Sequence, residues 1–253
     1  MLSIVCGILS PIVVAKKYAF MAPAISHSTI LGVALTLLCL PFSHTISLFL
    51  GTLGFTCIFV YFLARASHKG PLPSDSLIGI FLSTTMALGL IIHYKYIGGT
   101  SDLFSLLFGN ILLLDNFDLL VLFFLFLMCL ILVVRSLDRW IYFSFDPQGA
   151  KLSGVRTKLY HYGLFFLLTC LIVGAVKISG TILVSSLLIL PGTFAYKFSK
   201  NMSSVFKYSV IFAVLSGILG LFFANSFGWP PAPALALTQF LLFLPFGLIP
   251  NKN

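Results

Sequence analysis

The first side chains that could bind an ion or take part in a reaction lie in an apolar stretch, where His27 is flanked by Ser26, Ser28 and Thr29. A titratable side chain inside a membrane segment is costly unless it faces a partner or a water-filled path. Imidazole nitrogen binds transition metals, and oxygen ligands or water complete their coordination. His27 is therefore a candidate metal ligand on an ion path. The alternative is a packed histidine that is hydrogen-bonded to a neighbouring helix.

A second polar pair is formed by Thr181 and Ser185, which lie one and five residues after Gly180. Residues four positions apart lie on one face of a helix, so both hydroxyls are expected to face the same way. They are candidates to line the same metal path. The alternative is that each hydroxyl donates to a carbonyl of its own helix, which is common for such residues.

The most polar stretch of the chain runs from Asp146 to Val155. Pro147 predicts the start of a short helix with Asp146 as its N-cap. Ala150 and Gly154 are four residues apart and are expected to share a face of small residues. Such a face could dock into a groove on a soluble partner. A surface helix without a partner is the alternative.

The composition shows what must position these residues. Hydrophobic residues make up 59% of the 253-residue chain and charged residues only 8%, whereas a soluble domain has about 25% charged residues. About 20 apolar residues span a bilayer as a helix. We therefore predict one all-α integral membrane domain, residues 1–253, built as a polytopic bundle of about eight or nine transmembrane helices. The expected segments are 1–15, 23–40, 45–64, 77–96, 117–137, 159–176, 180–198, 206–227 and 231–249.

Basic residues predict the orientation of this bundle, because Lys and Arg accumulate in cytoplasmic loops. Their clusters recur after every second expected helix, which places the N-terminus outside and the C-terminus inside. The same rule accounts for the net charge of +9, so binding of nucleic acid is not expected. No Gly-x-x-x-x-Gly-Lys-Ser/Thr loop occurs, so the chain does not bind ATP through a P-loop.

Five segments, in order, resemble the permease subunits of bacterial zinc/manganese ABC transporters. They are 16–34, which includes Ser26-His27 and Gly32-Val33-Ala34, then 74–81, 107–112 (Leu-Phe-Gly-Asn-Ile-Leu), 180–191 (Gly-Thr-Ile-Leu-Val-Ser-Ser-Leu-Leu-Ile-Leu-Pro) and 230–234. The resemblance runs from about Ser10 to Leu244. One departure concerns the candidate site, because the family usually has Gly-Asp before the histidine, where this chain has Ala22-Pro23.

The resemblance implies a multi-pass protein of the cell inner membrane that does no covalent chemistry itself. It would pass a divalent metal ion inward as substrate, zinc first and manganese or iron next, with no permanently bound cofactor. Expected partners are membrane lipid, a second copy of the chain in a homodimer, a separate ATP-binding ABC subunit that hydrolyses ATP, and an extracytoplasmic metal-binding protein. The residues leave open which metal is carried. The alternative function is a passive metal channel or an intramembrane enzyme built around His27.

Overall fold

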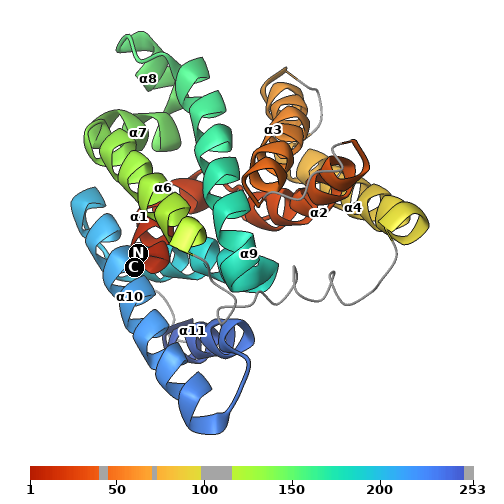
Figure 1. Ribbon diagram of the computed structural model, residues 1–253. Coiled ribbons are helices and arrows are strands. Elements are labelled where there is room, and N and C mark those ends of the chain that lie inside the picture. The colour runs from red at the N-terminus through yellow and green to blue at the C-terminus, as the bar shows by residue number, and fades with distance from the viewer. Residues whose placement is uncertain (40–44, 70–72, 98–115, 248–253) are drawn as a thin grey trace.

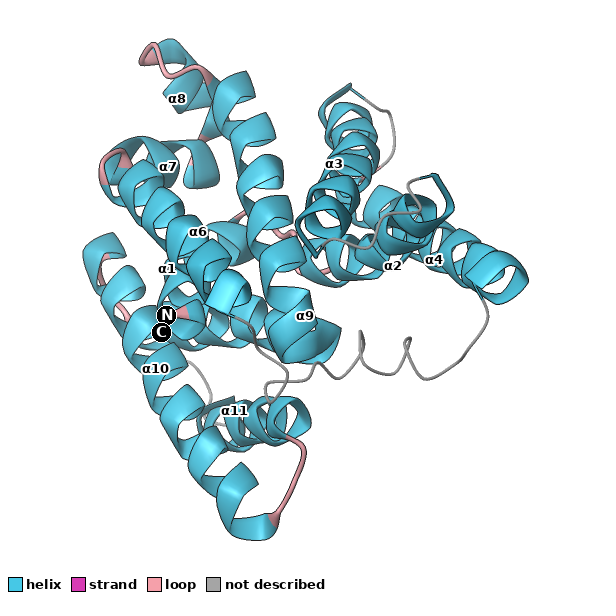
Figure 2. Cartoon of the chain, in the orientation of Figure 1, coloured by secondary structure: helices cyan, strands magenta, loops and turns pink. Residues whose placement is uncertain are grey.

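The computed structural model of the chain describes residues 1–39, 45–69, 73–97 and 116–247 (Figure 1). Within these ranges every regular element is a helix (Figure 2). In chain order the helices are α1 (Leu2–Ala15), α2 (Met21–Cys39), α3 (Thr45–Lys69), α4 (Ser74–Ile92), the π-helix η1 (His93–Ile97), α6 (Asn116–Val134), α7 (Leu137–Phe145), α8 (Pro147–Leu152), α9 (Thr157–Phe198), α10 (Met202–Phe227) and α11 (Pro231–Gly247). The all-α prediction is confirmed for the described part of the chain.

The predicted number of transmembrane helices is not confirmed. In the described ranges, six helical segments are long and apolar enough to cross a membrane, with α9 counted as two. A seventh results if the pair α6–α7, which is bent by 73°, is one broken span. Helices α1 and α11 are apolar but have only 14 and 17 residues, which is shorter than the roughly 20 residues of a full crossing.

Several helix ends follow directly from the local sequence. Gly228 ends α10 in the left-handed conformation, with φ 64° and ψ 27°, and only glycine adopts it without steric cost. Pro231, as the first residue of α11, needs no backbone N–H at that position. Helix α1 ends differently, because Lys17 takes φ 58° at the turn into α2. A side chain with a Cβ is strained in that conformation.

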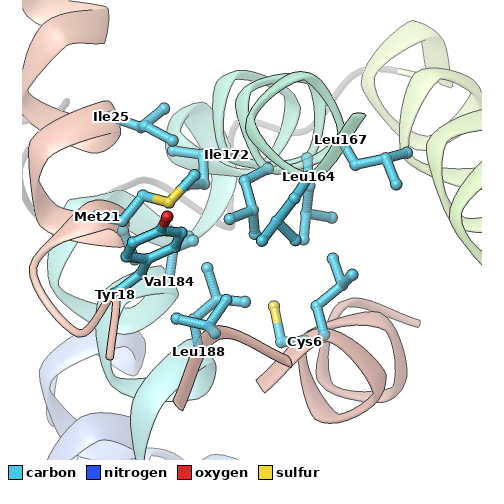
Figure 3. Close-up of a cluster of buried hydrophobic side chains, with 14 of the residues drawn as sticks. Cys6, Tyr18, Met21, Ile25, Leu164, Leu167, Ile172, Val184 and Leu188 are labelled. Atoms are coloured by element: carbon cyan, nitrogen blue, oxygen red, sulfur yellow. The ribbon is translucent and has the colours of Figure 1, made fainter. Parts of the chain in front are cut away.

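Helix α9 is the centre of the bundle. It packs against α1, α2, α3, α6, α10 and α11, and α2, α3 and α4 form one group on the side away from α6 and α7 (Figure 1). Figure 3 shows side chains of α1, α2 and both parts of α9 converging in one apolar core. Among them, Ile25, Leu164 and Leu188 are fully buried. Because lipid tails are as apolar as these side chains, their close contact stabilises the bundle through van der Waals packing and not through a hydrophobic driving force.

Small residues let α2 approach its neighbours closely. Ala24, Ser28, Gly32 and Thr36 are all buried along one stripe. A Cβ at Gly32 would lie 2.5 Å from Oγ1 of Thr56 on α3 and 3.0 Å from a backbone oxygen of the same helix. Close backbone approach through small residues is the usual packing mode of helices in lipid. The stripe therefore holds α2 against α3.

Candidate functional site

His27 lies on α2, the helix that is 61% buried over its apolar window, whereas the windows of α3 and α4 are only 22% buried. Its ring is partly buried, and Nδ1 is a buried atom without a hydrogen-bond partner. A buried polar atom usually has a partner. The alternative of a packed histidine bonded to a neighbouring helix thus lacks its expected bond at Nδ1.

The hydroxyls beside His27 divide into two kinds. Ser28 Oγ donates to the carbonyl of Ile25 at 2.7 Å, and Thr29 Oγ1 donates to the carbonyl of Ser26 at 2.6 Å. Both hydroxyls therefore have hydrogen-bond acceptors on their own helix. Ser26 Oγ is fully buried and has no partner. Of these three hydroxyls, Ser26 Oγ is therefore the one that lacks a hydrogen-bond partner.

The neighbours of α2 define the surroundings of His27. By the 3.6-residue repeat, His27 shares a face with Leu31 and not with Gly32. Helix α4 approaches at Leu31, because a Cβ on Gly89 would meet the Leu31 backbone nitrogen at 2.9 Å. The face of α2 that carries His27 therefore borders α4, and Thr56 of α3, which faces Gly32, does not join it.

Pro23 stands where the resemblance expects a carboxylate. It lies in the first turn of α2, which begins at Met21, and its missing N–H costs nothing there. Among the described residues, no group of three or more His, Cys, Asp or Glu side chains could hold a metal ion. As a candidate ligand, His27 therefore belongs to no such group in the described ranges, and an ion there would need oxygen ligands from hydroxyls, backbone or water.

The second predicted pair lies at a break in α9. Gly180 has φ 68° and ψ 169°, far from helical values, although α9 continues on both sides. Thr181 is buried immediately after this break. Ser185 Oγ donates to the carbonyl of Thr181 at 2.8 Å, so the backbone-bonding alternative holds for Ser185. The structure therefore brings Thr181 and Ser185 together, but the Ser185 proton is used within the helix.

The predicted cytoplasmic helix forms as α8, with one correction. Asp146 Oδ1 accepts from the Gly149 backbone N–H at 2.9 Å, which confirms the N-cap geometry. The expected shared face of Ala150 and Gly154 is wrong, because Ala150 is fully buried while Gly154 lies beyond the helix end, exposed, at φ 80°. The helix is too short, ending at Leu152, for the four-residue spacing to apply.

Two features of this region escaped the sequence analysis. Leu152 is 90% exposed at the end of α8, so a large apolar side chain projects beside Gly154. Helix α7 was expected neither as a helix nor as a bend after α6. Its signal in the sequence is the mixture of Arg139 and Asp138 with Trp140 and Phe143, which are buried, in the amphipathic pattern of a helix that lies on a membrane surface.

The comparisons with known proteins decide the family. The profile of the ABC 3 transport family matches residues 1–249. The chain belongs to this family. It is 32% identical over 243 residues to the "Manganese import system permease protein ScaB" of Streptococcus parasanguinis, covering 96% of this chain and 85% of that protein. It is 35% identical to the "Manganese transport system membrane protein MntB" of Synechocystis sp., covering 88% and 71%.

A solved structure supports the same assignment. A chain of "PsaBC from Streptococcus pneumoniae in complex with Fab" superposes with a TM-score of 0.83 and 31% sequence identity, over 99% of this chain and 88% of that chain. The ABC 3 permease is thus a multi-pass inner-membrane component of a transporter and not an enzyme. Of the five resembling segments, 107–112 lies outside the described residues.

Proposed function

We propose that this ABC 3 permease carries Mn²⁺ into the cell, as one half of a homodimer driven by separate ATPase subunits and supplied by an extracytoplasmic metal-binding protein. The names of its relatives support manganese and give no support to zinc, our first expectation. The observation that carries the proposal is the buried, unpartnered Nδ1 of His27 on the buried helix α2. Mn²⁺ accepts oxygen ligands readily, so one imidazole together with hydroxyls and water is sufficient to form a weak binding site.

Without a carboxylate at Pro23 an ion binds less tightly, which suits a transported ion better than a permanently bound one. A transported ion must bind strongly enough to enter and weakly enough to leave. The fully buried, unbonded Ser26 Oγ is an oxygen atom beside His27 in sequence. Thr181, beside the break at Gly180, is the next polar position that we assign to the path.

We assign coupling to the ATPase to α8 and the turn that follows it. Asp146 caps the helix, Ala150 anchors it inward, and Leu152 and Gly154 are exposed at its end. An exposed apolar side chain beside a glycine suits a groove on a soluble partner. Binding of ATP to that partner would then bias two conformations of the permease through different contacts in each state.

The test of the path is Mn²⁺ uptake into proteoliposomes that contain the permease and its ATPase. His27→Leu should abolish uptake while the protein remains inserted and folded, because the change removes the ligand nitrogen and keeps an apolar volume. Ser185→Ala is the matched control and should transport normally, because its hydroxyl bonds only to its own helix. Wild-type uptake by His27→Leu would move the path to Thr181. Uptake without ATPase or ATP would favour the passive channel.

The test of coupling is co-purification of the ATPase with the permease. Leu152→Asp and Gly154→Arg should both lose the ATPase, because a charge or a bulky cation opposes an apolar groove. Leu152→Met is the matched control and should retain it, since it keeps a large apolar side chain. Normal co-purification of Leu152→Asp together with normal uptake would refute the role of α8.

A further inference from the structure

Two histidines that the proposed path does not use lie together at the ends of α3 and α9. The ring centroids of His68 and His161 are 5.2 Å apart, with planes tilted by 39°. His161 is buried and His68 is exposed. Tyr162 lies against both rings, with centroids 5.5 Å from His161 and 6.2 Å from His68. The pair is thus half inside the bundle and half open to its surroundings.

The hydrogen bond of His161 determines which nitrogen is available. Nε2 lies 3.0 Å from the carbonyl oxygen of Ala64 on α3. A carbonyl only accepts, so Nε2 must carry the hydrogen, and Nδ1 of the neutral ring has the lone pair. Histidines that bind metals usually donate their other ring N–H to a carbonyl or carboxylate in this way, which fixes the tautomer and orients the ring.

The spacing of the two rings suits a shared ion. A ring nitrogen lies about 2.1 Å from a bound transition metal, which puts the metal about 3.2 Å from the ring centroid. Two imidazoles at a tetrahedral angle around one ion then have centroids about 5.3 Å apart. The observed 5.2 Å between His68 and His161 agrees with this separation. Water would complete the shell, since no third His, Cys, Asp or Glu joins the pair within the described ranges.

The pair lies near the N-terminal end of α2, the helix that carries His27. Tyr18, just before α2, packs edge-on against His161 with centroids 6.5 Å apart. His27 is six residues beyond Met21, the first residue of α2, or about 9 Å along the helix. Basic residues mark this end as cytoplasmic, and Lys16 is near enough to act electrostatically on His161. The positive charge of Lys16 repels a cation bound here, which favours its release.

We propose that His68 and His161 form a second divalent-cation site, an exit station of two imidazoles and water at the cytoplasmic end of the permease. Which ion uses it in the cell rests on the proposed function. Its existence rests only on the geometry of the pair, and the site is expected to take ions that accept imidazole ligands, such as Zn²⁺ and Co²⁺.

The experiment is calorimetric titration with ZnCl₂ of the purified permease in nanodiscs, without ATPase and with the affinity tag removed. The background is His27→Leu, so that binding at the proposed path does not contribute. His68→Gln in this background should lose one Zn²⁺ per chain or weaken its binding at least about tenfold. His93→Gln, which changes a buried histidine on η1, is the matched control and should bind as the background does.

The outcomes separate this site from the proposed path. Because His68 is exposed, His68→Gln should keep the thermal unfolding temperature of the background, so lost binding reports on the ligand. Unchanged Zn²⁺ stoichiometry and affinity in His68→Gln would show that the two rings only pack together and would overturn the proposal. Normal Mn²⁺ uptake by His27→Leu would refute the proposed path but leave this binding result unaffected.

Discussion

The break in α9 at Gly180 offers the sharpest test of how this backbone positions the candidate site. With φ 68° and ψ 169°, Gly180 occupies a region of backbone conformation that is essentially restricted to glycine, and forcing another residue into it costs about 1–3 kcal/mol. Gly180→Ala should therefore destabilise the folded protein by about that amount. For a chain of this size, the loss corresponds to a fall in the unfolding temperature of roughly 2 to 12 °C.

The matched control is the same substitution where glycine is not required. Gly54 lies inside α3, and a Cβ there would meet no atom within 4 Å. In a helix interior alanine is more stable than glycine by about 0.5–1 kcal/mol, so Gly54→Ala should raise the unfolding temperature. The two variants should shift in opposite directions when detergent-solubilised protein is heated and its circular dichroism is followed.

The functional consequence follows from the position of Thr181 directly after the break. If alanine straightens α9 at this point, the Thr181 side chain rotates away from its position on the proposed metal path. Mn²⁺ uptake should then fall even where the protein remains inserted. An unfolding temperature for Gly180→Ala equal to or above that of the wild type, with normal uptake, would show that the break is not required. The reasoning from backbone conformation would then be wrong.

Three further changes test the packing and charge of the α1–α2–α3 region. Gly32→Ala should lower stability by about 1–3 kcal/mol, because its Cβ would lie 2.5 Å from Thr56 Oγ1. Gly79→Ala is the control and should not lower stability, because a Cβ there meets no atom within 4 Å. Equal unfolding temperatures of the two variants would contradict this reasoning. Lys17→Gly should stabilise the fold by about 1 kcal/mol, since it removes the strain at φ 58°, and a lower unfolding temperature would count against that account. Burial lowers the pKa of Lys16 from 10.5 to about 8, so the folded state releases this proton more easily and stability should rise between pH 8 and pH 10.5. Lys16→Met should flatten that rise in unfolding measured across pH, and an unchanged slope would exclude Lys16 as its source.

Most of the architecture could be predicted from the sequence, because membrane insertion depends on local composition. Backbone groups in lipid must be satisfied within each segment, so a long apolar run with few charges becomes a helix. Each expected segment falls mostly on helix where the structure describes it, although 117–137 runs across the bend between α6 and α7. The cap at Asp146 was equally local, since a side chain three residues from a free N–H reaches it whatever the rest of the chain does.

Tertiary structure decided what depends on contacts between distant segments. Ala150 and Gly154 have the spacing of a shared helix face, but packing buries Ala150 and the chain leaves the helix before Gly154. The sequence does not show that the face of His27 borders α4. Nor does it place His68 beside His161. These two residues are far apart in the sequence, but their ring centroids lie 5.2 Å apart. Local sequence determines which segments cross the lipid and how they end, whereas close packing between helices determines which polar atoms are satisfied and which remain available to an ion.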